Sequence, residues 1–476
     1  MAIATRSPQS VRLFRDSGSF RDPSGGVLLS GDRVLRFFRP GAEGDFRKAL
    51  ASGALASLED RGLVVGSRVL DRAANPELYA SAVQATGADV ALLVEHPRIP
   101  FISYPYGWPF EMLRAAAIAQ LDVIEAALNK GFAVKDATAY NMQFIGSRPV
   151  FIDVASLEPY EQGGQWAGYA QFCRGFLNPL LLQSLRGVPF QPWLRHSLDG
   201  IDPAQLSRLL GLKNKLRPGV FVHVVLQAWL NRRFAGGETL KAAARSVSLA
   251  STLGLVRGLR KVVERLKRRG GKTTWVDYEA NLPYAAAALA AKERFVEQSV
   301  AAERPAVLWD LGCNQGLFSM IAARHAGYVV AMDFDEAAVG GLYEKLHGSE
   351  NVLPLVVDLM NPEPDQGWAQ DERRGLAARG PADFALALAL VHHLRISGNV
   401  PLHRIAQWLS TVTRAGVIEF VPKADPMVQR LLSTRRDVYP DYTQDAFEAA
   451  LNECFNIEER HQLPESQRVL YRFRCR

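Results

Sequence analysis

The chain has 476 residues, of which 48% are hydrophobic and 22% are charged, and its formal net charge is +7 at pH 7. A chain of this length exceeds one compact core and predicts two or three domains. No stretch reaches the roughly 18 uninterrupted apolar residues of a membrane-spanning helix, and the N-terminus lacks the apolar run of a secretory signal. We therefore expect a cytoplasmic protein without a membrane span.

The cysteines are too widely spaced for a metal cluster. They form no CxxC pair and have no companion histidine at zinc spacing. We expect free thiols and no bound metal at these positions, which are Cys173, Cys313, Cys454 and Cys475.

Residues 1–235 are expected to form an N-terminal α+β domain. The stretch DPSGGVLLSGDRVLRFF predicts a glycine-bearing hairpin, and EGDFRKALASGALASLEDRG predicts the helix that follows it. Over residues 111–132, Leu113, Leu121 and Leu128 recur on one helical face. This periodicity predicts a long helix that stops at Gly131.

A string of polar residues follows that helix. In FAVKDATAYNMQFIGSRPVFIDVASLE, Asp136 is followed by Asn141, by a predicted hairpin, and then by Asp153 after an apolar strand. This spacing is similar to the catalytic loop and metal-binding aspartate of protein-kinase-like and aminoglycoside-phosphotransferase folds. The resemblance implies that Asp136 receives the acceptor proton, while Asn141 and Asp153 hold magnesium around ATP.

The sequence departs from the kinase-like pattern at three points. Arg36 stands where the family has its lysine, Lys135 replaces the usual arginine before the aspartate, and Val-Ala follows Asp153 in place of Phe-Gly. Three interpretations therefore stay open: an active phosphotransferase, a degenerate kinase-like fold that presents a substrate or partner, and an unrelated α/β domain. In the last, Asp136 and Asn141 are simply turn residues.

The segment from Arg257 to Lys272 holds eight basic residues and one acid, so it accounts for the whole net charge. Apolar residues recur there at helical spacing, which predicts an amphipathic helix within a linker over residues 236–274. One interpretation is a solvated helix between two domains. The alternative is contact with RNA or an anionic membrane, which would make the protein an RNA-associated factor.

Residues 275–476 alternate apolar strands with helices, a pattern typical of a parallel, doubly wound sheet covered on both faces. The last two apolar segments predict a closing antiparallel hairpin. The expected strands are Val307 to Leu311, Tyr328 to Met332, Val352 to Val357, Phe384 to Leu390 and Val417 to Val421, with the hairpin at Phe455 to Glu459 and Val469 to Phe473.

A candidate cofactor loop follows the first of these strands. In VLWDLGCNQGLFS, Gly312 and Gly316 allow a ligand close to the backbone, and Asn314 is a residue that tolerates unusual backbone angles. A dinucleotide-binding enzyme would use similar physics. The acids at the ends of successive predicted strands favour a different cofactor. They are Asp310 before the loop, then Asp333 and Asp358.

This block resembles class I S-adenosylmethionine-dependent methyltransferases over nearly all of residues 275–476. The stretches LPLVVDLMNPEPDQGW, LALALVHHL and IEFVPKADPMVQRLL look like those of the nodulation-protein (NoeA-type) methyltransferases. The resemblance implies that Asp310 and Gly312 line the methionine end of S-adenosylmethionine, Asp333 holds the ribose and Asp358 lies by the adenine. The alternative is that these acids only cap helices, as we expect for Asp335.

The candidate catalytic residues follow the fourth and fifth strands. LVHHL supplies His392 and His393, and either is a candidate general base for a hydroxyl or carboxyl acceptor, although both are equally well interpreted as structural. Glu419 is a second candidate for acceptor contact. The Asn/Asp-Pro-Pro-aromatic motif that methylates planar amino groups is absent from the sequence. The leading hypothesis is methyl transfer to a small-molecule or carrier-bound acceptor, with the N-terminal domain recognising or preparing that acceptor.

Overall fold

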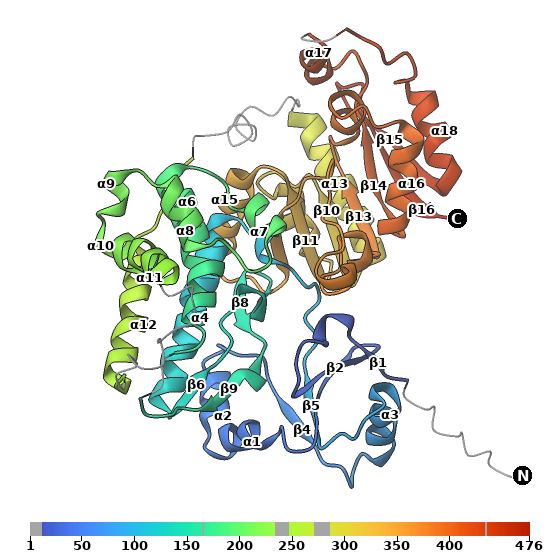
Figure 1. Ribbon diagram of the computed structural model, residues 1–476. Helices are drawn as coiled ribbons and strands as arrows, with labels where there is room; N and C mark the ends of the chain where they lie inside the picture. Colours follow the sequence, from blue (N-terminus) through green and yellow to red (C-terminus); the bar gives the residue numbers. More distant parts are fainter. Residues whose placement is uncertain (1–11, 164–165, 234–246, 271–285, 434–435) are drawn as a thin grey trace, which may run out of the picture.

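The computed structural model describes residues 12–163, 166–233, 247–270, 286–433 and 436–476 (Figure 1). The expected domain boundaries at 235/236 and 274/275 lie outside these residues, as does Lys272, so the boundaries stay predictions. Within the described ranges, no helix is both long and apolar enough to cross a membrane.

The N-terminal domain begins with a small antiparallel sheet whose strand order is β1-β2-β3-β5-β4. The predicted glycine-bearing hairpin is β2–β3, and it pairs from Gly25↔Phe38 to Ser30↔Arg33. The helix expected after it is two helices, because Gly53 takes a left-handed conformation (φ +72°) between them. The elements are β1 (Phe14–Arg15), β2 (Gly25–Ser30), β3 (Arg33–Phe38), α1 (Gly44–Ala51), α2 (Ala54–Asp60), β4 (Arg68–Leu70), α3 (Pro76–Thr86) and β5 (Leu92–His96).

A mostly helical half follows, built around α4 (Phe110–Asn129). Buried residues lie along most of α4, and Gly131 (φ +80°) ends the helical segment as the sequence predicts. The remaining elements are β6 (Phe132–Val134), β7 (Met142–Ile145), β8 (Arg148–Phe151), β9 (Leu157–Pro159), α5 (Tyr169–Phe172), α6 (Asn178–Arg186), α7 (Gln191–His196), α8 (Pro203–Leu209), α9 (Leu212–Lys215), α10 (Pro218–Val220), the π-helix η6 (Phe221–Leu226) and α11 (Gln227–Arg233). The hairpin predicted between Asn141 and Asp153 is β7–β8, which pairs from Met142↔Phe151 to Ile145↔Arg148.

The basic helix, α12 (Leu249–Glu264), packs against α4 and differs from the expected solvated linker. Its apolar face, including Leu259, is buried in the core shared with α4. Arg257 Nε donates to Glu125 of α4 at 2.8 Å, and Arg260 pairs with Asp122 of the same helix. Part of the positive charge on this segment is therefore matched by acids of the N-terminal domain, an arrangement that periodicity alone does not predict.

The C-terminal domain is a seven-stranded sheet of order β12-β11-β10-β13-β14-β16-β15. The five strands β10 to β14 pair in parallel, and β15–β16 close the edge as an antiparallel hairpin. This is the Rossmann-like methyltransferase sheet predicted from the sequence. Its elements are α13 (Ala286–Glu303), β10 (Val307–Leu311), α14 (Leu317–Ala322), β11 (Tyr328–Asp333), α15 (Glu336–Leu346), β12 (Val352–Val356), β13 (Phe384–Ala387), α16 (Leu402–Val412), β14 (Ala415–Phe420), α17 (Pro426–Leu432), α18 (Gln444–Cys454), β15 (Phe455–Gln462) and β16 (Val469–Cys475).

One predicted strand is too long. The apolar run Phe384 to Leu390 forms a strand only as far as Ala387, because Ala389 adopts a left-handed conformation (φ +50°) that turns the chain. The backbone N–H of Ala389 donates to the Glu419 carboxylate at 2.8 Å, which holds this turn at the end of β14. The apolar run therefore continues through the turn and does not mark the strand's end.

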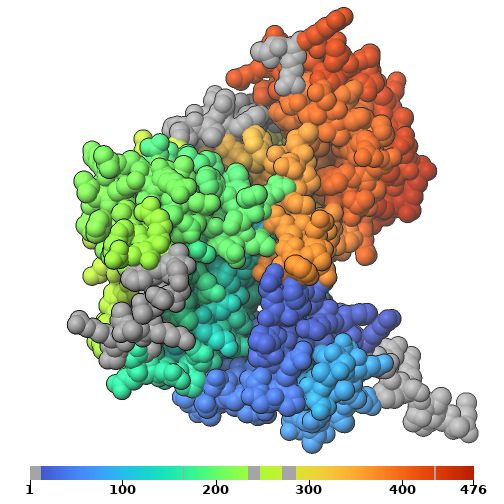
Figure 2. Space-filling view, viewed as in Figure 1, coloured from blue at the N-terminus to red at the C-terminus, as the bar shows by residue number. Residues whose placement is uncertain are grey.

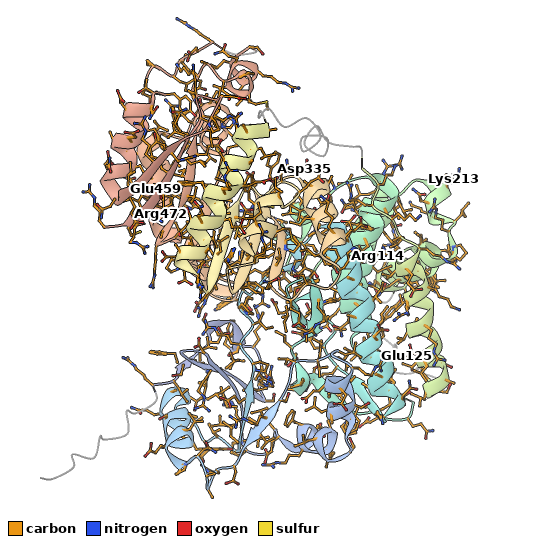
Figure 3. All side chains as sticks on the ribbon, turned by 180° about the vertical axis from the view of Figure 1, so that it is seen from behind. Arg114, Glu125, Lys213, Asp335, Glu459 and Arg472 are labelled. Carbon is orange, nitrogen blue, oxygen red and sulfur yellow. The ribbon has the colours of Figure 1, made fainter. Side chains whose placement is uncertain are left out.

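The two domains meet through α15, whose first residue is Glu336. Its carboxylate accepts hydrogen bonds from the backbone N–H of Phe110 at 3.1 Å, from Gln191 at 2.9 Å and from Gln183 at 2.5 Å. Phe110 is the first residue of α4, so an acid of one domain satisfies an unpaired N–H at the start of the other domain's central helix. Figure 3 labels the neighbouring residue Asp335 at this junction.

Apolar and charged contacts extend the same interface. The rings of Phe101 and Trp309 meet edge to face with centroids 5.8 Å apart, and the guanidinium of Arg379 lies over Phe101 while pairing with the buried Glu363. The backbone N–H of Gly146 also donates to the Tyr328 hydroxyl at 2.9 Å. The two domains thus share one hydrophobic core.

Replacing Glu336 with alanine should weaken this junction, because at least three N–H donors lose an acceptor at once. We expect the free energy of unfolding to fall by about 2 kcal/mol, measured by urea denaturation. Glu344→Ala, an exposed acid on the same helix, serves as the matched control and should change stability little. Equal destabilisation by the two variants would contradict the role given to Glu336.

Candidate cofactor and catalytic site

The loop after β10 has an unusual backbone that matches the predicted cofactor loop. Gly312, Asn314 and Gly316 all have positive φ, at +86°, +50° and +86°. The N–H groups of Gly312 and Cys313 both donate to the carbonyl of Met332, at 2.8 and 2.9 Å, which folds the loop toward the end of β11. The expectation that Asn314 tolerates an unusual conformation is confirmed.

The two glycines serve different purposes. A Cβ on Gly316 would lie 2.5 Å from the Leu342 side chain, so this glycine lets the start of α14 pack closely on α15. A Cβ on Gly312 would meet only Leu390, at the ordinary distance of 3.7 Å. Gly312 is therefore required for its backbone angle, and its surroundings leave room for a ligand near the backbone.

Two of the predicted acids lie beside this loop in buried positions. Asp310 is 2% exposed and accepts a hydrogen bond from the Ser319 hydroxyl at 2.6 Å, while burial raises its pKa to about 6. Asp333 accepts from the N–H groups of Asn314 at 2.8 Å and Asp335 at 2.9 Å, and burial raises its pKa as well. A carboxylate has about four acceptor positions, so Asp333 keeps capacity for further donors.

The other two acids of this series behave differently. The expectation that Asp335 caps a helix is confirmed, since its carboxylate accepts from the N–H of Ala337 at 2.9 Å at the start of α15. Asp358 was expected to end a strand, and this is wrong by two residues. Strand β12 stops at Val356, which pairs with Asp333. Asp358 is exposed in the following loop, where it accepts from the N–H of Met360.

A buried ion pair lies below the end of β14. Lys292 of α13 is 2% exposed and its ammonium lies 2.7 Å from the carboxylate of Glu419, which is fully buried. Burial lowers the pKa of Lys292. The same carboxylate accepts from the N–H of Ala389, so it joins α13, β14 and the turn after β13. This geometry favours a positioning role for Glu419, and contact with an acceptor stays a prediction.

A second buried cation extends the network toward the closing hairpin. Arg468 is 1% exposed, lies 3.6 Å from Glu419 and pairs with Asp425 at 2.7 Å. Asp425 also accepts from the N–H of Met427 and so caps α17. The network therefore ties the β15–β16 turn to the segment that follows β14, at the carboxyl edge of the parallel strands.

Sequence reasoning missed Ser319, Lys292 and Arg468. A single lysine inside the apolar helical stretch AAAALAAKERFV was a signal for Lys292, because a buried lysine needs an acidic partner. No comparable local signal marks Arg468, which precedes an apolar strand. Its role depends on strand pairing between residues far apart in the chain.

The two predicted histidines lie side by side after β13. Their ring centroids are 4.2 Å apart, His392 is 2% exposed and His393 is half-buried. Burial lowers the pKa of His393 to about 4 and that of His392 well below its usual value. Both rings are therefore neutral at pH 7. A neutral ring can accept a proton, but a low pKa makes it a weak base.

The structure brings the predicted kinase-like residues together in the N-terminal domain. Arg36 of β3 donates to Asp153 at 2.8 Å and to Asp22 at 3.1 Å. Asn141 lies 3.5 Å from the other oxygen of Asp153, while Asp136 accepts from a backbone N–H two residues on. Burial raises the pKa of Asp153. Arg36 thus occupies the place expected for the family's lysine and faces the expected metal-binding aspartate.

No family model matches the chain. The nodulation protein NoeA of Rhizobium meliloti (strain 1021) is 38% identical over 480 residues, which cover 99% of this chain and 98% of that protein. The O-antigen chain terminator bifunctional methyltransferase/kinase WbdD of Escherichia coli is 29% identical over 143 residues, covering 28% of this chain and 18% of that protein.

Solved structures with partial likeness include two enzymes. The N-methyltransferase NodS from Bradyrhizobium japonicum WM9, in complex with S-adenosyl-L-homocysteine, aligns with 12% identity and a TM-score of 0.32 over 43% of this chain and 99% of that chain. WbdD with the kinase inhibitor LY294002 aligns with 19% identity and a TM-score of 0.29 over 41% of this chain and 42% of that chain. Scores of this size carry no assignment of activity.

Removing the ammonium of Lys292 should leave the Glu419 carboxylate buried beside a weaker partner. We expect Lys292→Met to lower the free energy of unfolding by about 3 kcal/mol in urea denaturation. The double variant Lys292→Met/Glu419→Gln removes the uncompensated charge and should recover much of that loss. A double variant less stable than the single one would contradict the ion pair's assigned importance.

Proposed function

This chain belongs to the family of nodulation protein NoeA, and on that premise we propose that it is an S-adenosylmethionine-dependent methyltransferase. The observation that carries the proposal is the meeting of Asp310, Gly312 and Asp333 at the carboxyl edge of a sheet ordered β12-β11-β10-β13-β14-β16-β15. Ligands of open α/β sheets bind at this edge, where the strand order reverses.

Each residue of the site has a chemical role in the proposal. Gly312 lets the methionine end of the cofactor approach the backbone, and Asp310 faces its ammonium group. The Asp333 carboxylate accepts from the ribose hydroxyls in addition to the backbone N–H groups that already hold it. In the proposal, Asp358, exposed beyond β12, or the neighbouring backbone would meet the adenine amino group. These roles come from the resemblance, and the buried acids and open loop support them.

The cofactor supplies a methyl group on a positively charged sulfur, and the transfer is an in-line displacement. With the cofactor bound, its carbon–sulfur bond would break as a bond to the acceptor atom formed, and the acceptor would lose its proton. His393 is half-buried and is the better placed of the two histidines to receive that proton, since His392 is almost fully enclosed. The low pKa of His393 also suits a neutral ring that only orients the acceptor. The acceptor is proposed to be a small molecule or a carrier-bound group.

Titration calorimetry with S-adenosylmethionine tests cofactor binding by the full chain. We expect Asp333→Ala to weaken binding at least about tenfold, because charged hydrogen bonds to two hydroxyls are lost. Asp445→Ala, an exposed acid on α18, is the control and should bind like the wild type. Wild-type protein that fails to bind the cofactor would overturn the proposal. If replacing both His392 and His393 with alanine leaves turnover unchanged, only the hypothesis that a histidine acts as the general base is excluded.

A second candidate function is magnesium-dependent phosphotransfer from ATP by the N-terminal domain. The observation that favours it is the cluster of Arg36, Asn141 and Asp153, in which a guanidinium faces a buried carboxylate. Oxygen atoms of Asn141 and Asp153 are of the type that magnesium prefers, and Asp136 would receive the proton of the acceptor hydroxyl. The description of WbdD as a methyltransferase/kinase supports this candidate. The pairing of Arg36 with Asp153 argues against phosphotransfer, because the guanidinium occupies the carboxylate that would bind magnesium.

Calorimetry with ATP and magnesium distinguishes the two possibilities for this domain. If it is a phosphotransferase, the full chain should bind ATP only with magnesium, and Asp153→Asn should lower the affinity about tenfold or more. Asp45→Asn, an exposed acid on α1, is the control. Absence of magnesium-dependent binding by the wild type would leave the domain a degenerate kinase-like fold that presents an acceptor.

A further inference from the structure

The largest concentration of exposed apolar side chains in the described residues lies on one segment of the N-terminal domain, residues 209–233, here called the α9–α11 surface. Leu212 and Leu216 are 81% and 77% exposed, and Trp229 is 49% exposed. Side chains of this kind in contact with water are costly when they gather in one place, so such a patch usually marks an interaction site.

The exposed residues follow the geometry of the helices. On η6 and α11, Val222, Leu226, Trp229 and Leu230 recur at helical spacing on the outward side, while Val224 faces the core. In Figure 1 the labels α9, α10 and α11 stand at the outer edge of the helical half, away from the sheet of the C-terminal domain, and Figure 2 shows the same green segment forming that edge. The apolar row is therefore presented outward.

The same surface carries charge of a single sign. Residues 203–233 contain six basic side chains and no aspartate or glutamate, although the whole chain has 49 acids. Lys213 and Arg217 are exposed beside Leu212 and Leu216, and Arg233 lies over the ring of Trp229 at 5.8 Å from its centroid. Figure 3 labels Lys213 at the edge of the helical half, seen from behind.

The basic helix α12 adds to this surface from the side. A Cβ on Gly219 of α10 would lie 2.8 Å from the side chain of Val262, so α10 and α12 are in close contact. Lys261 and Arg265 are exposed on that part of α12 and are not among the arginines that pair with α4. The positive charge of the surface is thus larger than that of the α9–α11 segment alone.

We propose that the α9–α11 surface docks the protein peripherally on a bilayer of anionic lipids. Exposed leucine, phenylalanine and tryptophan side chains would enter the interface between headgroups and acyl chains, and the surrounding lysines and arginines would face the lipid phosphates. The absence of acids from residues 203–233 fits a uniformly negative partner. A row of apolar side chains on the outside of the molecule fits the apolar interior of a bilayer. The phosphate backbone of a nucleic acid is bound mainly through basic side chains and offers no place for aliphatic ones. The inference does not depend on the proposed transferase activity.

Vesicle sedimentation of the full chain tests the proposal. The wild type should pellet with vesicles of phosphatidylcholine and phosphatidylserine, much less with phosphatidylcholine alone, and less as salt is raised. Lys213→Glu/Arg217→Glu should weaken binding to the anionic vesicles about tenfold or more. Arg47→Glu/Arg404→Glu makes the same change in net charge at exposed positions elsewhere and should bind like the wild type. Circular dichroism checks that every variant is folded.

A second readout reports insertion at a single side chain. Brominated lipids should quench part of the tryptophan fluorescence of the wild type, and that quenching should be lost in Trp229→Phe. The proposal would be overturned by no binding to anionic vesicles at low salt, by equal loss of binding in the two double variants, or by binding to RNA without binding to vesicles. Binding without quenching at Trp229 would exclude insertion and so contradict the proposed mode of docking.

Discussion

The hydrogen bonds of Glu336 determine how the two halves of this protein are joined. An acid at the start of α15 accepts from the first N–H of α4 and from two buried glutamines of the other domain. Glu336 follows directly on Asp335 and lies three positions after Asp333, and these two acids shape the candidate cofactor edge. The α4 helix in turn leads through β6 to the loop that holds Asp136. One short junction therefore connects the candidate cofactor edge with the helix that supports the kinase-like loop, and both belong to a single hydrophobic core.

A network of buried charged side chains holds together the elements around β14 and the closing hairpin. Lys292, Glu419, Arg468 and Asp425 bring together α13, β14, the closing hairpin and the start of α17. Paired charges of this kind are held in place because separating them would leave a charge without compensation inside the protein. The turn after β13 is held by a hydrogen bond from the Ala389 N–H to the same Glu419 carboxylate, and the neutral histidine pair follows that turn. The network therefore positions the segment in which an acceptor base is proposed.

Sequence patterns correctly predicted the elements that are determined by residues close together in the chain. The bounds of β10 agree with the apolar run Val307 to Leu311, the stop at Gly131 follows from its positive φ, and Asp335 caps the helix that it precedes. The parallel pairing of β10 to β14 was also expected from the alternation of strands with helices. Each of these features depends on residues within a few positions of one another.

The features that the sequence did not predict depend on residues that lie far apart in the chain. The packing of α12 on α4 depends on acids more than 130 positions away, such as Glu125 opposite Arg257. The short β13 depends on Glu419, 30 positions beyond Ala389. Arg36 meets Asp153 across the two halves of the N-terminal domain, and nothing near either residue indicates the pair. Long-range pairing of charged groups is the information that a single sequence does not display.

Hydrogen-exchange mass spectrometry of the full chain, with and without S-adenosylmethionine, tests most directly whether the edge formed by β10 and β11 is the cofactor site. The account predicts slower exchange in residues 310–316 and 333–338 when the cofactor is present, because a ligand at this edge orders the loop and the start of α15. It also predicts slower exchange at the start of α4, which is held by Glu336. Protection confined to residues 136–153, or no protection anywhere, would contradict it.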